Sequence, residues 1–262
     1  KEFIMVRLIV ATLLFVWMSP LMGQDLPPKK QTVFQAGEEL KYKVKYGILT
    51  VGEGNIKVEQ TDFRFDNKPV WHLIGEGYTA GAFAIYKVRN RYDSYIDMEN
   101  LTPYFYTENI REGSYRRGDK ARFFQDKKLI VANQDSLKIE TKTFDVISAY
   151  FFARSLDLTK IKPGDTFSIN YFLTREVSKM DITYVGKEKI ESALGYVNCL
   201  KFNPSIQPGR IFKKNSKLYL WITDDGNRIP VRAQVDIFLG SITIDLISAK
   251  GLKYPTIIEP KP

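Results

Sequence analysis

Hydrophobic and polar residues alternate with a period of two over much of the chain. The clearest case lies at residues 40–46, where Leu40, Tyr42 and Val44 alternate with lysines. Successive side chains of a β-strand point to opposite faces of a sheet, so this pattern predicts a strand with one packed face and one solvated face. Similar runs, separated by short turn-like segments, recur along the chain. They predict a mainly β protein with a large antiparallel sheet that is strongly curved or barrel-like.

The clearest hairpin is expected after residues 218–223, which alternate in the same way as the strand that follows them. Asp224, Asp225 and Gly226 lie between the two runs and tolerate the positive φ that a tight turn requires. Pro230 has no N–H for a ladder, so it is expected at a strand start or edge. We interpret these four residues as structural turn residues, because the aspartates lack the alternating oxygen ligands of a calcium loop.

One segment departs from this period. Residues 145–157 contain neither glycine nor proline, and Ile147, Tyr150, Phe151 and Arg154 recur at helical spacing. The first three form an apolar stripe, which the arginine stem extends. The pattern predicts one principal helix packed on the sheet. It makes Tyr150, Phe151 and Arg154 candidates for contact with a ligand held between helix and sheet.

A second candidate site is a basic cluster of Arg116, Arg117, Lys120 and Arg122, interleaved with aromatic residues. The formal net charge of +9 favours anionic partners in general. Such interleaving is also found in nucleic-acid grooves, but the secretory leader described next argues against nucleic acid. The cluster predicts a hairpin with one solvated cationic face. The alternative, which makes these four residues candidates for ligand binding, is contact with anionic lipid or glycan.

The N-terminus has the pattern of an export signal. Arg7 is followed by 11 uncharged, mainly apolar residues, too few for a bilayer span of about 20. Cleavage is expected near Gly23, which leaves a periplasmic or secreted protein with no transmembrane span. An uncleaved N-terminal anchor is the alternative. The predicted organisation is a signal peptide at 1–23, a disordered leader at 24–33, a single β-rich domain at 34–253 and a frayed tail at 254–262.

The sequence offers little for catalysis or metal binding. It contains one histidine, His72, and one cysteine, Cys199, which cannot build a tetrahedral nitrogen and sulfur site. Both lie in alternating runs and are interpreted as structural strand residues. No glycine-rich phosphate loop and no nucleophile elbow are present. We therefore expect no catalytic residues, no metal and no cofactor.

Several short motifs, taken in order, resemble a bacterial family called domain of unknown function 3108. The motifs are Gly37 and Glu38 ahead of Leu40 and Tyr42, residues 93–97 ahead of Leu101 and Pro103, residues 148–154 ahead of Gly164, and residues 220–225 ahead of residues 228–231. The resemblance spans nearly all of residues 34–251. It implies an exported envelope protein rich in antiparallel β structure, and it supplies no catalytic residues.

Two kinds of function fit these expectations. The first is a non-catalytic envelope protein that binds or carries an apolar, lipid-like or anionic ligand. The second is a structural or assembly protein that acts through surface contacts with other proteins. A cavity between the helix and the sheet favours the first, whereas a filled core with an exposed apolar patch favours the second. An enzyme is the least favoured class.

Overall fold

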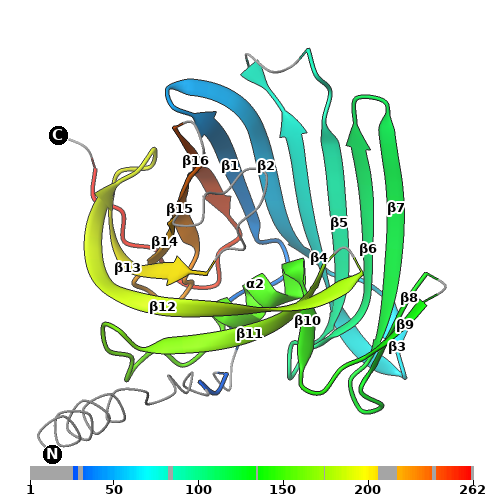
Figure 1. Ribbon diagram of the computed structural model, residues 1–262. Coiled ribbons are helices and arrows are strands. Elements are labelled where there is room, and N and C mark those ends of the chain that lie inside the picture. The colour runs from blue at the N-terminus through cyan, green and yellow to red at the C-terminus, as the bar shows by residue number, and fades with distance from the viewer. Residues whose placement is uncertain are drawn as a thin grey trace, which may run out of the picture.

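The structure is a computed structural model, and it describes residues 26–28, 32–81, 85–133, 135–173, 175–205, 217–237 and 240–260. The predicted signal peptide lies outside these residues. Within them, 16 strands form one sheet around a helix, α2 (Val146–Arg154) (Figure 1). The strands are β1 (Glu39–Tyr46), β2 (Leu49–Glu59), β3 (Arg64–Phe65), β4 (Lys68–Thr79), β5 (Arg89–Asp97), β6 (Pro103–Glu112), β7 (Tyr115–Phe124), β8 (Leu129–Ala132), β9 (Asp135–Lys138), β10 (Thr143–Asp145), β11 (Thr166–Leu173), β12 (Glu176–Glu191), β13 (Tyr196–Pro204), β14 (Leu218–Thr223), β15 (Pro230–Asp236) and β16 (Ser241–Lys250).

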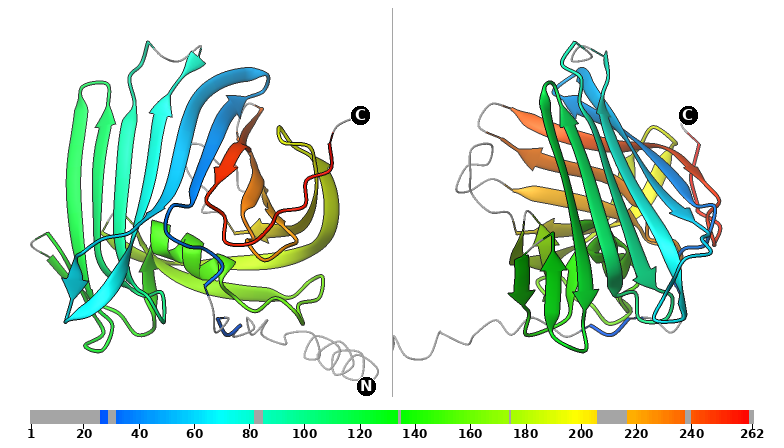
Figure 2. Two further views of the ribbon diagram at one scale, coloured as in Figure 1. Left: turned by 180° about the vertical axis from the view of Figure 1, so that it is seen from behind. Right: turned by 90° about the vertical axis from the view of Figure 1, so that its right-hand side faces the viewer.

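Most neighbours in the sheet are also neighbours in sequence. The order is β10-β11-β12-β13-β14-β15-β16-β1-β2-β4-β5-β6-β7-β8-β9, and β3 pairs with β4 off this path. All ladders are antiparallel except that between β10 and β11. The first strand, β1, pairs with the last, β16, so the two halves of the chain share one sheet. The sheet curves around α2 without closing, which confirms the predicted fold class (Figures 1 and 2).

A capping box starts the helix one residue later than the sequence predicts. The Asp145 carboxylate accepts hydrogen bonds from the backbone N–H groups of Ile147 and Ser148, and the Ser148 hydroxyl accepts one from the Asp145 N–H. This arrangement satisfies N–H groups that would otherwise lack partners in the first turn. Ser94 of β5 donates to the same carboxylate at 2.6 Å. The helix start is therefore tied to the concave face of the sheet.

The helix ends at Arg154, three residues before the predicted end at residue 157. The Ser155 N–H donates to the Phe152 carbonyl and its hydroxyl donates to the Phe151 carbonyl, which closes the last turn. Leu156 then leaves the helix and forms a β-bridge with Pro28. The apolar residues beyond Arg154 thus pack in the core as extended chain and not as helix.

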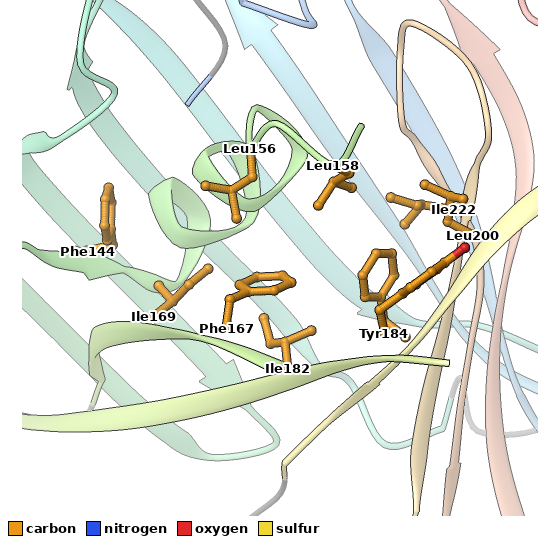
Figure 3. Packing of buried hydrophobic residues seen from close by; sticks show 10 residues of the cluster. Phe144, Leu156, Leu158, Phe167, Ile169, Ile182, Tyr184, Leu200 and Ile222 are labelled. Carbon is orange, nitrogen blue, oxygen red and sulfur yellow. The ribbon is translucent and has the colours of Figure 1, made fainter. Parts of the chain in front are cut away.

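Apolar side chains of the concave face pack on both sides of α2. On one side, Phe151 is fully buried, with its ring 4.7 Å from that of Phe34. On the other, Ala149, Phe152 and Ala153 pack against a buried cluster, in which Leu156 and Leu158, just beyond the helix, point toward side chains from β11 and β12, as Figure 3 shows. The buried members of that cluster are Phe144, Leu156, Leu158, Phe167, Ile169, Ile182, Tyr184, Leu200, Phe202 and Ile222. Burying one such side chain stabilises the fold by about 1.5–3 kcal/mol. Because the helix packs against many of them, it is an integral part of the core.

Side chains rather than a ladder join the two arms of the curved sheet. The rings of Phe123 on β7 and Phe172 on β11 meet edge to face at 5.9 Å. Nearby, Arg175 in the β11–β12 turn forms an ion pair with Asp119 of β7 at 3.0 Å. These contacts hold the sheet in its bent form although β9 and β10 remain its two ends.

Described residues in both segments flanking the domain contact it. In the predicted leader, Val33 is buried, and the Pro27 carbonyl accepts a hydrogen bond from the Asp157 N–H. In the predicted tail, Glu259 pairs with Tyr196 at the start of β13.

Candidate functional site

The predicted hairpin forms between β14 and β15, but its geometry differs from that expected. The Asp225 carboxylate accepts hydrogen bonds from the backbone N–H groups of Asn227 and Arg228. The residue with positive φ is Arg228, at 51°, rather than Gly226. Glycine is required at position 226 because a Cβ there would lie 2.7 Å from the ring of Tyr254. Of the other predicted turn residues, Asp224 pairs with Lys187 and Pro230 starts β15.

The three candidates on the helix face the protein interior. Arg154 is 3% exposed and forms a bidentate ion pair with Glu38, which is 1% exposed, at 2.6 and 3.1 Å. Its guanidinium also donates to the Asn227 carbonyl at 2.9 Å. Phe151 is buried beside it, and burial raises the pKa of the Tyr150 hydroxyl to about 12. The charge of Arg154 is therefore already balanced within the fold.

The cavity beside these residues is small. Its volume is about 50 Å³, room for a few water molecules, whereas ligand pockets hold about 300–1,000 Å³. It is lined by Tyr150, Ala153, Arg154, Leu158, Phe167, Ile182, Phe202, Leu220, Ile222 and Pro230. A wider opening of about 400 Å³ lies on another side of the helix, where it is lined by Phe152, Leu156 and residues of β11. Space for an apolar ligand is thus found beside the helix rather than at the predicted residues.

The basic cluster on β7 does not form one patch, because strand alternation divides it. Arg117 lies on the concave face and forms an ion pair with the buried carboxylate of Glu108. Arg122 lies on the convex face, where its guanidinium stacks 4.4 Å above the ring of Phe65. Arg116 and Lys120 are on that convex face as well, and both are exposed. Only these outward residues are in a position to meet a large anionic partner.

The register of the convex face brings together an arginine row, consisting of Arg89, Arg111 and Arg116. Arg111 of β6 lies opposite Arg116 of β7. Arg89 of β5 lies opposite Arg111 from the other side. That register is fixed by the pairs flanking it, Val88 with Glu112 and Arg91 with Asn109. Adjacent strands are about 4.8 Å apart, so the backbone positions of the three arginines lie within about 10 Å of one another.

No ion pair compensates the arginine row among the residues that the structure describes. Arg116 donates to backbone carbonyls of its own turn, and Arg111 donates to the side chain of Asn109. Like charges directly opposite each other destabilise a sheet. The fold thus tolerates an unfavourable arrangement at this place, which is typical of a binding site rather than of a structural element.

A polar groove of about 460 Å³ adjoins the row. It is lined by Asn55, Glu76, Gly77, Tyr78, Arg89, Asn90, Arg91, Asn109 and Arg111. Arg91 is neutralised by Asp93 at 2.7 Å and Glu76 at 3.2 Å. Although burial acts in the opposite direction, hydrogen bonds from His72 and Arg91 hold the pKa of Asp93 below its usual value. The groove therefore has paired charges on one side and, among the described residues, arginines without an ion pair on the other.

Sequence reasoning identified Arg116 but missed Arg89 and Arg111. One signal was present, since a two-residue turn at Gly113 and Ser114 would pair Arg111 with Arg116. The third arginine joins the row through the longer β5–β6 turn, whose register a sequence pattern does not define.

His72 and Cys199, which were considered for catalysis or metal binding, make structural contacts. His72 stacks on Tyr95 at 4.5 Å, and its Nε2 lies 2.8 Å from Asp93. Cys199 is buried, which raises its thiol pKa to about 12. In the described part of the chain, no group of three or more histidine, cysteine or acidic residues has the geometry of a metal site. The same residues include no helix long and apolar enough to cross a bilayer.

Comparison with solved structures supports the fold. The chain is similar to a β-barrel-like protein of domain of unknown function DUF1849 from Brucella abortus, with a TM-score of 0.54 and 8% identity, covering 86% of this chain and 100% of that one. A Bacteroides fragilis protein described as exported, with a YmcC-like fold, gives a TM-score of 0.38 and 12% identity over 84% and 99% of the two chains. A hypothetical protein from Chlamydia trachomatis gives 0.38 and 7% over 87% and 93%.

Sequence comparison identifies the family. No curated protein matches the chain. The family described as "Protein of unknown function (DUF3108)" matches it over residues 41–247, which is most of its length. The chain therefore belongs to the DUF3108 family, as its motifs indicate.

Proposed function

We propose that this protein is exported to the cell envelope, where it binds an anionic ligand without catalysing a reaction. The observation that carries this proposal is the arginine row on the convex face, in which none of the three guanidinium groups has an acidic partner in the described part of the chain. Guanidinium groups bind phosphate and carboxylate oxygens through paired hydrogen bonds. The adjoining groove supplies amide and hydroxyl groups that bind the remaining oxygens of a phosphorylated or acidic ligand. The leader at residues 1–23 supports export.

Binding of soluble anions to the exported protein tests the proposal. We would measure affinities by calorimetry for a heparin-derived hexasaccharide and for dihexanoyl phosphatidylglycerol below its micelle concentration, with maltohexaose as the uncharged comparison. The first two probes separate a glycan from a lipid headgroup as the source of the anion. We expect binding of at least one anionic probe, weakening with salt, and none of maltohexaose.

A pair of arginine variants locates the site. Losing one charged hydrogen-bonding partner costs about 1.5–3 kcal/mol, so Arg111→Gln should weaken binding by at least about tenfold. Arg64→Gln removes the same charge from β3, outside the groove, and should change affinity by less than about twofold. Equal losses in both variants, or no binding of either anion, would overturn the proposal.

A second candidate function is the carriage of an apolar ligand. It is favoured by the opening beside α2, whose volume of about 400 Å³ lies within the range of ligand pockets. Native mass spectrometry of protein purified gently from the periplasm tests it. Co-purified lipid that is lost in Phe152→Ser, with the protein still folded, would support carriage. Its absence from repeated preparations would count against it.

A further inference from the structure

Three hairpin turns lie at one end of the sheet, next to the arginine row. They are the β1–β2 turn at residues 47–48, the β4–β5 connection and the β6–β7 turn at residues 113–114. Because β1, β2, β4, β5, β6 and β7 are antiparallel neighbours, the β1–β2 turn, the β6–β7 turn and the described residues of the β4–β5 connection lie at the same end of the strands, at the top of Figure 1. The side view in Figure 2 shows the same arrangement.

The turns expose apolar side chains. Ile48 is 97% exposed, Ile85 96%, Tyr86 57% and Tyr115 52%. Single exposed apolar residues are ordinary, but a group on adjacent turns marks an interaction surface. The β4–β5 connection and the β6–β7 turn contact each other, since a Cβ at Gly113 would lie 2.8 Å from the ring of Tyr86 and the Gly113 N–H donates to the Lys87 carbonyl. We call Ile48, Ile85, Tyr86 and Tyr115 the apolar rim.

Positive charge lies directly behind the apolar rim. Arg116 follows Tyr115 in sequence, and Arg111 and Arg89 complete the row across the next two strands. The nearby carboxylates are Glu76, which pairs with Arg91, Glu112, which accepts a hydrogen bond from Asn90, and Glu53, which accepts one from Tyr78. None of them forms an ion pair with the arginine row among the described residues. This end of the sheet thus combines the apolar rim with the arginine row.

We infer that this end of the sheet, which carries the apolar rim and the arginine row, docks onto an anionic membrane surface. The inference rests on the proposed function, in which the arginine row binds anions, and it adds the class of partner. Apolar side chains at the rim enter the boundary between headgroups and acyl chains, while the arginines behind them bind lipid phosphates. Isoleucine offers a glycan no hydrogen bond, whereas the acyl region of a bilayer accepts it favourably. The protruding isoleucines therefore favour a membrane over a glycan.

Vesicle sedimentation tests the inference with protein purified from the periplasm, whose N-terminus is established by mass spectrometry so that no uncleaved leader contributes. Wild-type protein should bind vesicles of phosphatidylglycerol and phosphatidylcholine, and bind pure phosphatidylcholine at least about tenfold more weakly. The double variant Ile48→Ser, Ile85→Ser should lose at least about tenfold in vesicle binding. It should bind dihexanoyl phosphatidylglycerol as wild type does, because its arginines are intact.

The control is Val177→Ser, Val185→Ser, which removes two exposed apolar residues from β12 on the other arm of the sheet. It should bind vesicles like wild type. Vesicle binding that is unchanged by the isoleucine substitutions, or absent while a soluble anion still binds, would overturn membrane docking and leave the proposed function standing. Absence of binding to every anionic probe would remove both. Each variant is checked by circular dichroism and thermal melting before binding is compared.

Discussion

Arg154, the last residue of α2, forms a bidentate ion pair with Glu38, which immediately precedes β1, and the two side chains are 3% and 1% exposed. The residues are 116 positions apart in sequence. Their contact fixes the end of the helix to the point where the sheet begins.

The pair predicts a large loss of stability when one partner is removed. Glu38→Ala should lower the free energy of unfolding by about 3–5 kcal/mol, because it leaves the Arg154 charge buried with only a backbone carbonyl to accept from it. Urea denaturation followed by circular dichroism measures this change. Lys41→Ala, on the solvated face of β1, should cost less than about 0.5 kcal/mol. A loss below about 1 kcal/mol for Glu38→Ala would contradict the role assigned to the pair.

The arginine row predicts a variant that is more stable but binds less well. Arg111→Gln removes the middle one of three like charges, so it should raise the free energy of unfolding by about 0.2–1 kcal/mol. Arg91→Gln, on the neighbouring strand, should lower stability instead, because Arg91 pairs with both Asp93 and Glu76. Urea denaturation at low ionic strength compares the two. If both substitutions changed the free energy of unfolding in the same direction, repulsion between Arg111 and its neighbouring arginines would be ruled out.

The pKa of Asp93 predicts a pH-dependent contribution to stability. Because this pKa is lowered in the folded protein, the unfolded state binds more protons between the two pKa values. The stabilisation is therefore complete above the unfolded value of about 3.9 and is lost as the pH falls through the folded value. Asp93→Asn should cost about 1 kcal/mol at pH 6 and almost nothing near pH 2. A difference between wild type and variant that does not depend on pH would refute this account.

The close approach of Tyr254 to Gly226 predicts a rescue. Gly226→Val should lower the melting temperature by an amount equivalent to about 1–3 kcal/mol, because its side chain must displace the tyrosine ring. Adding Tyr254→Ala should return most of that loss relative to Tyr254→Ala alone. Gly77→Ala is the matched control, since its Cβ meets nothing within 4 Å. If strain in the turn backbone were the cause, the tyrosine substitution would give no rescue.

The buried thiol predicts slow labelling. Cys199 is 1% exposed and its thiol pKa is raised to about 12, so the thiolate is scarce at pH 8. Ellman's reagent should react with it only after unfolding in guanidinium chloride. Reaction of the native protein within seconds would show that β13 opens readily.

Local patterns in the sequence predicted the elements that local forces determine. The helical spacing of Tyr150, Phe151 and Arg154 placed α2 to within a few residues, because one face of that helix is buried. The alternation around residues 218–223 also placed β14 and its hairpin, although both faces of this strand pack, with Ile222 in one buried cluster and Trp221 in another. Neither pattern predicts that Arg154 pairs with Glu38, because the two residues are far apart in sequence and meet only in the tertiary fold.

The candidate site depends on register, which explains why most of it was missed. A shift of one residue between β5 and β6 would move Arg89 away from Arg111 and turn it to the other face. That register is set by the packing of Tyr106 and Ile96 on the concave face and by the β5–β6 turn, where Leu101 adopts a φ of 62°. The basic residues were visible in the sequence, but their alignment across three strands was not.

The pairing of β1 with β16 has a consequence for how this chain folds as it is synthesised. Lys45 and Asp245, joined across that ladder, are 200 residues apart. Until β16 has been made, β1 is therefore paired only with β2, and its other side stays open to association with other chains. Folding is thus expected to be slow and to benefit from a holding chaperone.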